Sequence, residues 1–234
     1  MIKGLIWDLD GVITDTSKLH REAWIEVLKM HLDVKDKKQI EDNYNHFFSG
    51  VPRLVGIKRF LDSCNANYSN KKDLEELASY IAEFKNKLFR EKVSDLDIVV
   101  YSDALSLLKF SKELGLKNGL ASQSENADLV LDKSGIRKYL DSAATGITAK
   151  KSSIPPKPDP AFYRHAANLL GIDIKECMVF EDTYAGAFSA VTAGVNVCVG
   201  VARSQSSTLE LASAGSDIIT RDLTQFRKLL KFNE

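Results

Sequence analysis

Two aspartates one residue apart, Asp8 and Asp10, stand directly after an apolar run that begins at Ile2, and Gly11 follows them. Side chains at positions i and i+2 of a β-strand point to the same face, so the two carboxylates should lie together until the chain turns at the glycine. Two crowded carboxylates raise each other's pKa unless a cation lies between them. The motif therefore predicts either a metal ion or a buried proton at the end of the first strand.

Four further polar residues stand where predicted strands end or in a stiff loop. Ser122 follows one apolar strand, Glu181 and Asp182 follow another, and Lys157 lies in a proline-rich loop. Ligands of open α/β sheets bind beyond the carboxyl ends of the strands, so these residues should meet at one edge. Taken singly, each has an ordinary explanation: a solvated turn, the cap or N-terminus of a helix, or a surface lysine.

The combination of these groups favours one kind of chemistry. Carboxylates from two strand ends suit a hard cation such as Mg²⁺, which prefers oxygen ligands. Ser122 and Lys157 supply the hydrogen-bond donor and the positive charge that the oxygens of a transferring phosphoryl group need. Asp8 can then attack phosphorus, and Asp10 can move the proton.

The elements that must position these residues change character twice along the chain. Between residue 17 and about residue 90 the apolar residues recur with helical spacing. From about Ile98 short apolar strands alternate with amphipathic helices, which indicates a parallel sheet with helices on both faces. We expect strands at 2–9, 98–101, 116–122, 141–146, 177–182 and 195–201. The sequence therefore predicts a Rossmann-like α/β core, residues 1–14 and 95–234, with an inserted α-helical cap domain, residues 15–94.

The overall composition limits the class of partner. The chain has 234 residues, of which 44% are hydrophobic, enough to fill a sizeable core. Its 32 basic and 32 acidic side chains cancel, which argues against a nucleic-acid or membrane surface. We therefore expect a small-molecule partner and a chain that acts as a monomer.

Cysteine content and hydropathy favour the cytoplasm. The three cysteines, Cys64, Cys177 and Cys198, are too few and too far apart for a disulfide framework or a zinc site, and we expect all three to be buried. The N-terminus has the pattern of a strand rather than of a signal peptide, and no apolar run approaches the roughly 20 residues that a membrane span requires. We expect a soluble, cytoplasmic protein.

With these residues placed, the sequence resembles the haloacid dehalogenase superfamily of phosphotransferases. The segment Asp8–Thr16, Ser122, Lys157 and the segment Glu181–Gly186 match its four motifs, and the match spans nearly the whole chain. The resemblance implies an aspartyl-phosphate mechanism, with Asp8 as the nucleophile and Asp10 as the general acid and base. It also implies a Mg²⁺ ion bound by the Asp8 carboxylate, the Asp10 backbone carbonyl and Asp182, with Glu181 nearby. The second aspartate argues against dehalogenation, because members that attack carbon lack it.

Within this superfamily the sequence is similar to the β-phosphoglucomutases, and this similarity extends into the predicted cap. It implies substrate-binding residues in two places. In the cap they are His20, Trp24, Gly50, Val51, Arg53, Lys85 and Asn86, and after the strand at 116–122 they are Gln123, Ser124 and Asn126. Two of them have a simpler explanation, because Trp24 lies on an apolar helical stripe and Arg53 could be a solvated cation.

The sequence departs from the mutase pattern at two points. Glu125 occupies the position where the mutases have a lysine near the second, non-reacting phosphate. A carboxylate there repels a phosphate, so either Glu125 turns outward or the substrate has no second phosphate at this place. The turn around Asp103 also lacks the usual proline and glycine.

Three functions from different classes remain in competition. The first is an isomerase that moves a phosphoryl group of a hexose phosphate between C1 and C6, and the second is a sugar-phosphate phosphatase. Both use Asp8 and Asp10, so the motifs do not separate them. The third is a non-catalytic protein that binds a sugar phosphate with the same fold. The intact set of catalytic groups favours the two enzymes, and the mutase is preferred over the phosphatase.

Overall fold

The computed structural model describes residues 1–31, 44, 46–64, 71–203 and 207–231. The chain forms two compact units: an α/β unit of residues 1–16 and 98–234, and a helical unit of residues 17–97. The helical unit is thus an insertion after the first strand. The boundaries predicted from the sequence lie after residues 14 and 94, whereas the compact units divide after Thr16 and after Asp97.

The α/β unit is built on a six-stranded sheet in which all neighbouring strands run parallel, in the order β3-β2-β1-β4-β5-β6. Its strands are β1 (Gly4–Trp7), β2 (Lys117–Ala121), β3 (Ser142–Ala144), β4 (Cys177–Glu181), β5 (Val197–Val201) and β6 (Ile218–Thr220). In the centre of the sheet, Trp7 of β1 pairs with Leu120 of β2 and with Phe180 of β4. Every residue of β1 and β4 is buried, as a strand covered on both faces requires.

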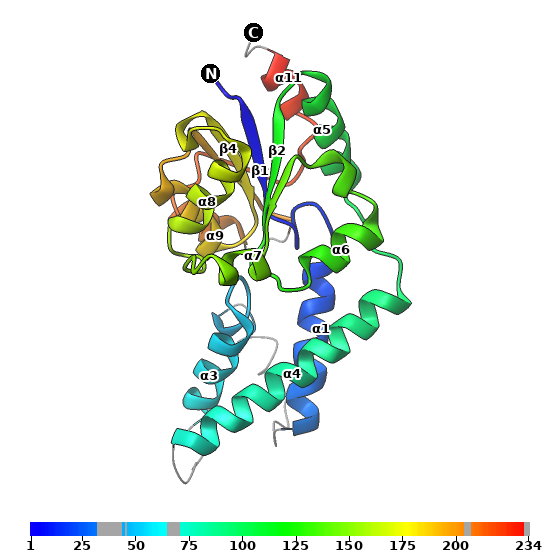
Figure 1. Ribbon diagram of the computed structural model, residues 1–234, viewed down its shortest axis with the longest axis vertical. Helices are drawn as coiled ribbons and strands as arrows, with labels where there is room; N and C mark the ends of the chain where they lie inside the picture. The colour runs from blue at the N-terminus through cyan, green and yellow to red at the C-terminus, as the bar shows by residue number, and fades with distance from the viewer. Residues whose placement is uncertain (32–43, 45, 65–70, 204–206, 232–234) are drawn as a thin grey trace. The chain divides into compact units, whose positions relative to one another are not determined.

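Helices cover both faces of this sheet (Figure 1). They are α5 (Ser102–Glu113), α6 (Ala127–Ser134), α7 (Gly146–Lys151), α8 (Ala161–Leu170), α9 (Tyr184–Ala193), α10 (Ser207–Ser213) and α11 (Phe226–Lys231), with short 3₁₀ turns η1 (Arg137–Tyr139) and η2 (Ile174–Glu176). The helices α8 and α9 lie on one side of β1 and β2, and α5 and α11 lie on the other. The α8 side contains a large apolar core to which Phe162, Tyr163 and Val179 belong.

The strand expected at residues 98–101 is not present. Val100 makes only an isolated bridge to Thr14, and Val99 is 61% exposed. A short apolar run forms a buried strand only where it can pair with the edge of a sheet and pack under a helix. This segment instead leads the chain from the helical unit back to the α/β unit. The sixth strand of the sheet is β6, whose three half-buried residues are too short a run to stand out in the sequence.

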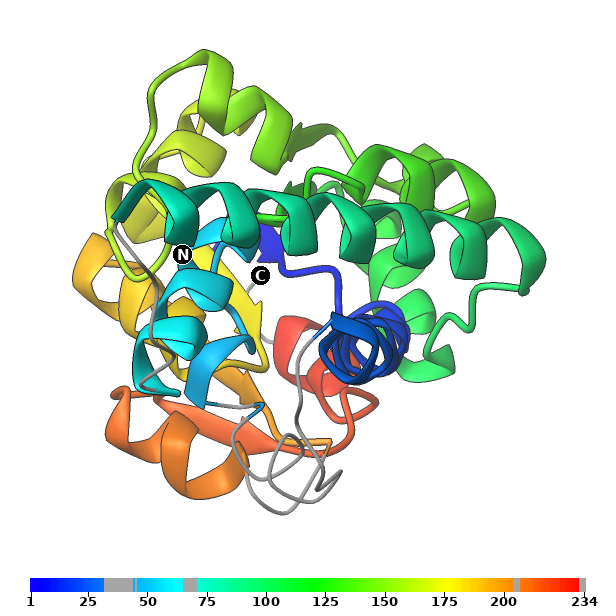
Figure 2. The same cartoon turned by 90° about the horizontal axis from the view of Figure 1, so that it is seen from below.

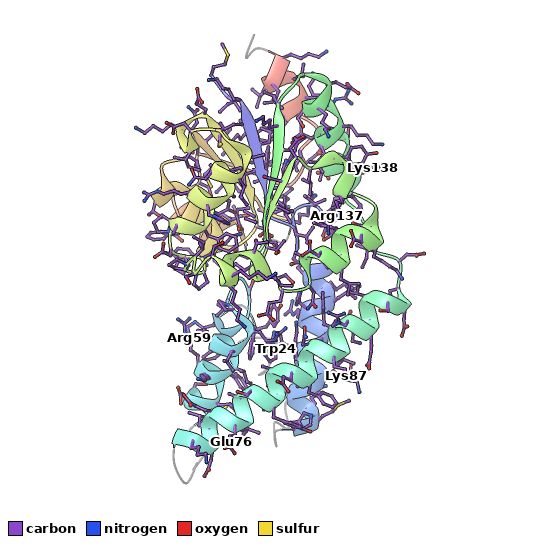
Figure 3. All side chains as sticks on the ribbon, viewed as in Figure 1. Trp24, Arg59, Glu76, Lys87, Arg137 and Lys138 are labelled. Atoms are coloured by element: carbon purple, nitrogen blue, oxygen red, sulfur yellow. The ribbon has the colours of Figure 1, made fainter. Side chains whose placement is uncertain are left out.

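The helical unit consists, in its described residues, of α1 (Thr16–His31), α3 (Arg53–Ser63) and α4 (Lys71–Asp95). The long helix α4 crosses α1, as the view along α1 shows (Figure 2). Their apolar stripes meet in a core that contains Trp24, Ile57, Phe60 and Ile81. Trp24 lies in this interior, and charged side chains such as Glu76 and Lys87 lie on exposed faces (Figure 3).

The expectation of three buried cysteines was wrong for one of them: Cys177 and Cys198 are buried, but Cys64 at the end of α3 is exposed. Among the described helices, none combines the length and the apolar character needed to cross a membrane.

Candidate active site

Three neighbouring strands end at the same edge of the sheet, and each presents a polar residue there (Figure 1). Asp8 follows β1, Ser122 follows β2, and Glu181 is the last residue of β4. The backbone N–H of Asp8 donates to the Phe180 carbonyl at 3.0 Å, and that of Ser122 donates to the Ala144 carbonyl at 2.9 Å. The ladder of the sheet thus continues through these residues and holds them in register.

Lys157 joins these strand ends from a loop far away in the sequence. Its buried Nζ donates to Asp8 Oδ1 at 2.8 Å, to the Ala121 carbonyl at 2.8 Å and to Glu181 Oε1 at 2.5 Å. All three N–H bonds of the ammonium group are therefore used. Burial alone would lower the pKa of Lys157, but the carboxylates of Asp8 and Glu181 raise it above its ordinary value. The lysine is thus held as a cation against Asp8.

Glu181 is itself held by several donors. Its Oε1 also accepts from the Tyr163 hydroxyl at 2.9 Å. Its Oε2 accepts from the backbone N–H of Asp182 at 2.9 Å and from the N–H and hydroxyl of Thr183 at 3.0 and 3.1 Å. A Cβ at Gly186 would lie 1.8 Å from Glu181 Oε1, so the first turn of α9 needs a glycine at this position. Both oxygens of Glu181 are committed to protein donors, which favours a role in holding Lys157.

Asp8 and Asp182 are two carboxyl groups buried close to one another. Burial raises the pKa of Asp8 to about 7, against the effect of Lys157, and Glu181 and Asp10 raise it further. Burial and the charge of Asp8 also raise the pKa of Asp182 well above its ordinary value. Asp182 Oδ1 is buried and has no hydrogen-bond partner among the described residues. The surrounding protein thus disfavours the charged form of both groups, and a cation between them would favour it.

Asp10 is oriented by the first residue of α1. The Thr16 hydroxyl donates to Asp10 Oδ1, and the hydroxyls of Thr16 and Thr14 lie 2.7 Å apart. The Asp10 side chain is half-buried, and its charge contributes to the raised pKa of Asp8. The pattern around Thr16 does not reveal that it is a partner of Asp10, because a threonine at a helix start is ordinary.

The segment 122–126 folds as a tight turn after β2. The Ser122 hydroxyl accepts from the N–H of Ser124, and the Ser124 hydroxyl accepts from the N–H of Asn126, both at 3.2 Å. The turn packs so closely on the start of α7 that a Cβ at Gly146 would lie 2.3 Å from the Gln123 carbonyl oxygen. Asn126 is buried, and Gln123 and Ser124 are half-buried.

Glu125 differs from its neighbours in this turn, because it is exposed. Its carboxylate lies 3.8 Å from Lys150 Nζ of α7, with side chains 42% and 81% exposed, respectively. This exposed pair binds weakly, so it leaves the orientation of Glu125 open to change by a ligand.

The helical unit contains its own polar cluster, in which His20 and Lys85 are joined. Lys85 Nζ and His20 Nδ1 are 2.5 Å apart, and Lys85 is only 2% exposed. The His20 ring stacks on Phe89 with centroids 3.8 Å apart. Burial lowers the pKa of His20 well below its ordinary value, and the charges of Lys85 and Arg53 lower it further. His20 is therefore neutral and accepts at Nδ1, which leaves its proton on Nε2.

The other cap residues predicted to bind substrate have different surroundings. Arg53 Nη1 donates to Asn86 Oδ1 at 2.7 Å, and this hydrogen bond joins the start of α3 to the middle of α4. Gly50 has a positive φ of 64°, and the turn that it forms with Val51 leads directly into α3. Trp24 is 3% exposed and stacks on Phe48, so the structure favours the simpler explanation of this residue, a place in the apolar core.

Comparison with known proteins identifies the family. The model that describes haloacid dehalogenase-like hydrolases matches residues 2–194. The chain belongs to this family. It is accordingly an enzyme of the phosphotransferase and phosphatase type, as the resemblance implied.

Similar proteins include both enzyme types left open by the motifs. The crystal structure of a β-phosphoglucomutase from Clostridium difficile has a TM-score of 0.78 and 29% identity, over 99% of this chain and 96% of that one. A β-phosphoglucomutase of Mycobacterium bovis is 25% identical over 96% of this chain and 91% of its own length. A phosphorylated carbohydrates phosphatase of Thermotoga maritima is 27% identical over 92% of both chains.

The donor set at the sheet edge fits the Mg²⁺ ion that enzymes of this family typically use. Two buried carboxylates with raised pKa values and an unsatisfied Asp182 oxygen suit a hard divalent cation. A Cβ at Gly11 would lie 2.0 Å from Asp182 Oδ2, so only glycine leaves room beside this carboxylate. Among the described residues no three side chains of His, Cys, Asp or Glu form a metal cluster. A site on Asp8, Asp182 and the backbone carbonyl of Asp10 is compatible with that finding, since it uses only two side chains.

Proposed function

We propose that this enzyme is a Mg²⁺-dependent hexose-phosphate mutase of the β-phosphoglucomutase type, which moves a phosphoryl group between C1 and C6 through an aspartyl-phosphate at Asp8. The observation that carries the proposal is the contact of Asp8 with the buried cation of Lys157. A carboxylate held this way at a sheet edge is oriented for attack and cannot turn into solvent. Similarity to the β-phosphoglucomutases over nearly the whole chain supports the choice of substrate.

In this mechanism each residue of the α/β unit has one task. Asp8 attacks phosphorus with the oxygen that Lys157 does not hold, and Lys157 with Ser122 stabilises the charge on the phosphoryl oxygens. Asp10, oriented by Thr16, gives a proton to the leaving oxygen and later takes one from the attacking hydroxyl. Asp8, Asp182 and the Asp10 backbone carbonyl would hold Mg²⁺, which would neutralise charge at the phosphoryl group. Glu181 keeps Lys157 in place.

We assign substrate recognition to two groups of residues. In the helical unit these are His20, Gly50, Val51, Arg53, Lys85 and Asn86, and after β2 they are Gln123, Ser124 and Asn126. The paired Lys85 and His20, and the paired Arg53 and Asn86, are pre-oriented donors suited to sugar hydroxyls and a phosphate. Trp24 supports them from the apolar core.

The second candidate function is a sugar-phosphate phosphatase, and Glu125 is the observation that favours it. This carboxylate lies in the turn that would hold a second phosphate. Its ion pair with Lys150 is exposed and therefore weak, so the negative charge of Glu125 would repel a phosphate bound there. The Thermotoga maritima relative has a phosphatase name. A non-catalytic binding protein is the remaining alternative, and it requires that the groups around Asp8 do no chemistry.

One assay separates these functions. The purified protein is incubated with Mg²⁺, β-glucose 1-phosphate and a trace of glucose 1,6-bisphosphate, and both glucose 6-phosphate and free phosphate are followed. A mutase produces glucose 6-phosphate with little free phosphate, and the Asp8→Asn variant produces neither. Free phosphate as the main product identifies the phosphatase, and no product with any of a panel of sugar phosphates identifies the binding protein.

A further inference from the structure

Arg203 follows β5 and lies where three segments that are distant in the sequence meet. Its Nε donates to the Gly11 carbonyl at 3.2 Å, and its Nη2 donates to the Val12 carbonyl at 3.0 Å. Its two terminal nitrogens also donate to the two carboxylate oxygens of Asp103, at 3.1 and 3.2 Å. Nη1 donates to the Arg221 carbonyl at 3.4 Å. All five N–H bonds of the guanidinium group are therefore used.

The surroundings of this guanidinium make it rigid. The group lies 3.7 Å from the centroid of the Tyr101 ring, and the side chains of Arg203 and Asp103 are 18% and 12% exposed. Asp103 Oδ2 also accepts from the N–H of Leu223 at 3.0 Å. A forked, mostly buried arginine–carboxylate pair of this kind holds its geometry more strictly than an exposed ion pair does. Asp103 stands in the turn where the sequence lacks the proline and glycine of the mutase pattern.

The two carbonyls that Arg203 holds belong to the loop that carries Asp10. Gly11 has a φ of +95°, and its N–H donates to the Thr14 carbonyl at 2.7 Å. Gly11 is thus fixed on both sides, by Thr14 at its N–H and by Arg203 at its carbonyl. Because a peptide group is planar, fixing the Gly11 N–H also fixes the direction of the Asp10 carbonyl.

We propose that Arg203 is a positioning residue for phosphoryl transfer: by clamping the Gly11 and Val12 carbonyls it keeps the Asp10 carbonyl directed at the metal and the Asp10 side chain directed at the reacting oxygens. The proposal rests on the proposed function, in which Asp10 has both tasks. Arg203 touches neither the metal nor the substrate, and it acts only through the loop. Groups that orient metal ligands in this way typically contribute about 10- to 100-fold to metal affinity or activity.

The test compares Arg203→Lys with Arg137→Lys. Lysine keeps the charge of Arg203 but cannot make the five bonds, so the fold should survive while the clamp is lost. Arg137 is a matched control in the same unit (Figure 3), since it pairs with Asp128 and Asp132 of α6 and does not contact the loop after β1. Asp103→Asn is a second variant, which keeps the shape of the partner and weakens its hold on Arg203.

Five quantities are measured for each variant. They are Mg²⁺ affinity by calorimetry with the metal alone, kcat and KM for the preferred sugar phosphate, hydrogen exchange of residues 9–14 without metal, and the urea midpoint. Arg203→Lys should bind Mg²⁺ about 10-fold more weakly and lose about 10-fold in kcat, with KM changed less than about twofold. The Gly11 amide should exchange faster. Asp103→Asn should change the same quantities in the same direction, and Arg137→Lys should match the parent in all of them.

Two results would overturn the proposal. Unchanged exchange at Gly11 in Arg203→Lys and Asp103→Asn would show that the arginine does not clamp the loop. Faster exchange with unchanged Mg²⁺ affinity and kcat would show that the clamp is structural and positions nothing. Failure of the proposed function gives a different result: the parent would then not convert β-glucose 1-phosphate into glucose 6-phosphate, whatever Arg203→Lys does to Gly11 exchange and Mg²⁺ affinity.

Discussion

In the α/β unit the charged side chains come from the ends of neighbouring strands and from the Lys157 loop, whereas in the helical unit the polar side chains come from the inner faces of helices. Lys157 is buried between Asp8 and Glu181, and every N–H of its ammonium group has a partner. Lys85 is equally buried, and both lysines lie over aromatic rings, but Lys85 has a neutral histidine as its partner instead of two carboxylates.

This difference supports the roles that we propose for the two units, chemistry in the α/β unit and substrate recognition in the helical unit. The strand ends and the Lys157 loop bring charge of both signs together, which suits a reaction in which charge moves. The helices hold a neutral histidine and a lysine against buried aromatic rings, and we assign these donors to recognition of a sugar. Substitutions in the α/β unit should therefore lower kcat, and substitutions in the helical unit should mainly raise KM.

The largest effect is expected from Lys157→Met, which would leave Asp8 and Glu181 buried without their cation. Turnover should fall by about 10²- to 10³-fold, and removing one partner of a buried ion pair should lower the free energy of unfolding by about 3 to 5 kcal/mol. Steady-state kinetics and urea unfolding measure the two effects. In Lys112→Met, which loses an exposed pair with Asp141, both quantities should stay near those of the parent. A Lys157→Met enzyme with near-normal kcat would remove the main distinction between the two units.

Asp10→Asn should affect one half of the reaction more than the other. Phosphorylation of Asp8 by an acyl phosphate has a good leaving group and should continue slowly, whereas transfer to a sugar hydroxyl should fall by about 10²- to 10⁴-fold. Mg²⁺ affinity should persist, because only the backbone carbonyl of Asp10 is assigned to the metal. Calorimetry that shows the same loss of Mg²⁺ binding in Asp10→Asn as in Asp182→Ala would contradict this assignment.

A smaller effect, confined to binding, is expected from Arg53→Met. The variant loses the hydrogen bond to Asn86 and a cation assigned to the substrate phosphate, so KM for the sugar phosphate should rise by about 10-fold with little change in kcat. Phosphorylation of Asp8 by acetyl phosphate should be unaffected. Arg59→Met is the control, because Arg59 lies on the same helix and is exposed (Figure 3). A fall in kcat with an unchanged KM would mean that the helical unit takes part in the chemistry itself.

The smallest effect concerns the pH dependence of stability. Burial, Lys85 and Arg53 lower the pKa of His20, so the unfolded chain binds a proton that the folded chain excludes. The contribution of His20 is thus fully present above its ordinary pKa of about 6.5 and is lost as the pH falls below it. Urea unfolding at pH 8 and pH 5 should show a larger loss for the parent than for His20→Gln, with His165→Gln like the parent. Equal losses in parent and His20→Gln would show that this histidine is not held neutral.

The strand-end residues could be predicted from the sequence because local patterns determine where strands stop, and a parallel sheet brings those ends together. Asp8, Ser122 and Glu181 were placed on one edge in this way, without any knowledge of side-chain contacts. The roles of Tyr163 and Arg203 could not be predicted, because their partners are distant in the sequence: Arg203 and Gly11 are 192 residues apart. The strand expected at residues 98–101 is an opposite case, in which a local pattern predicted an element that does not form. A local apolar pattern does not reveal whether other elements pack on that segment.

The residues proposed to bind substrate illustrate the same distinction. Trp24 was indicated both by resemblance and by its place on an apolar stripe, and only its packing on Phe48 shows which explanation the structure favours. Glu181 was expected near the metal, but its hydrogen bonds to Lys157, Tyr163 and Thr183 were not apparent from the motif. Sequence patterns identify candidate residues, and the contacts in the structure show which role each of them can have.

The central claim, that Asp8 carries the phosphoryl group, can be tested directly by trapping the intermediate. The enzyme is mixed with Mg²⁺ and an acyl phosphate or glucose 1,6-bisphosphate, quenched in acid within milliseconds to seconds, and digested for mass spectrometry. The peptide that contains Asp8 should gain one phosphoryl group, which should be absent from Asp8→Asn and from samples without Mg²⁺. A phosphoryl group on another residue, or an Asp8→Asn enzyme that still turns over its substrate, would contradict this claim.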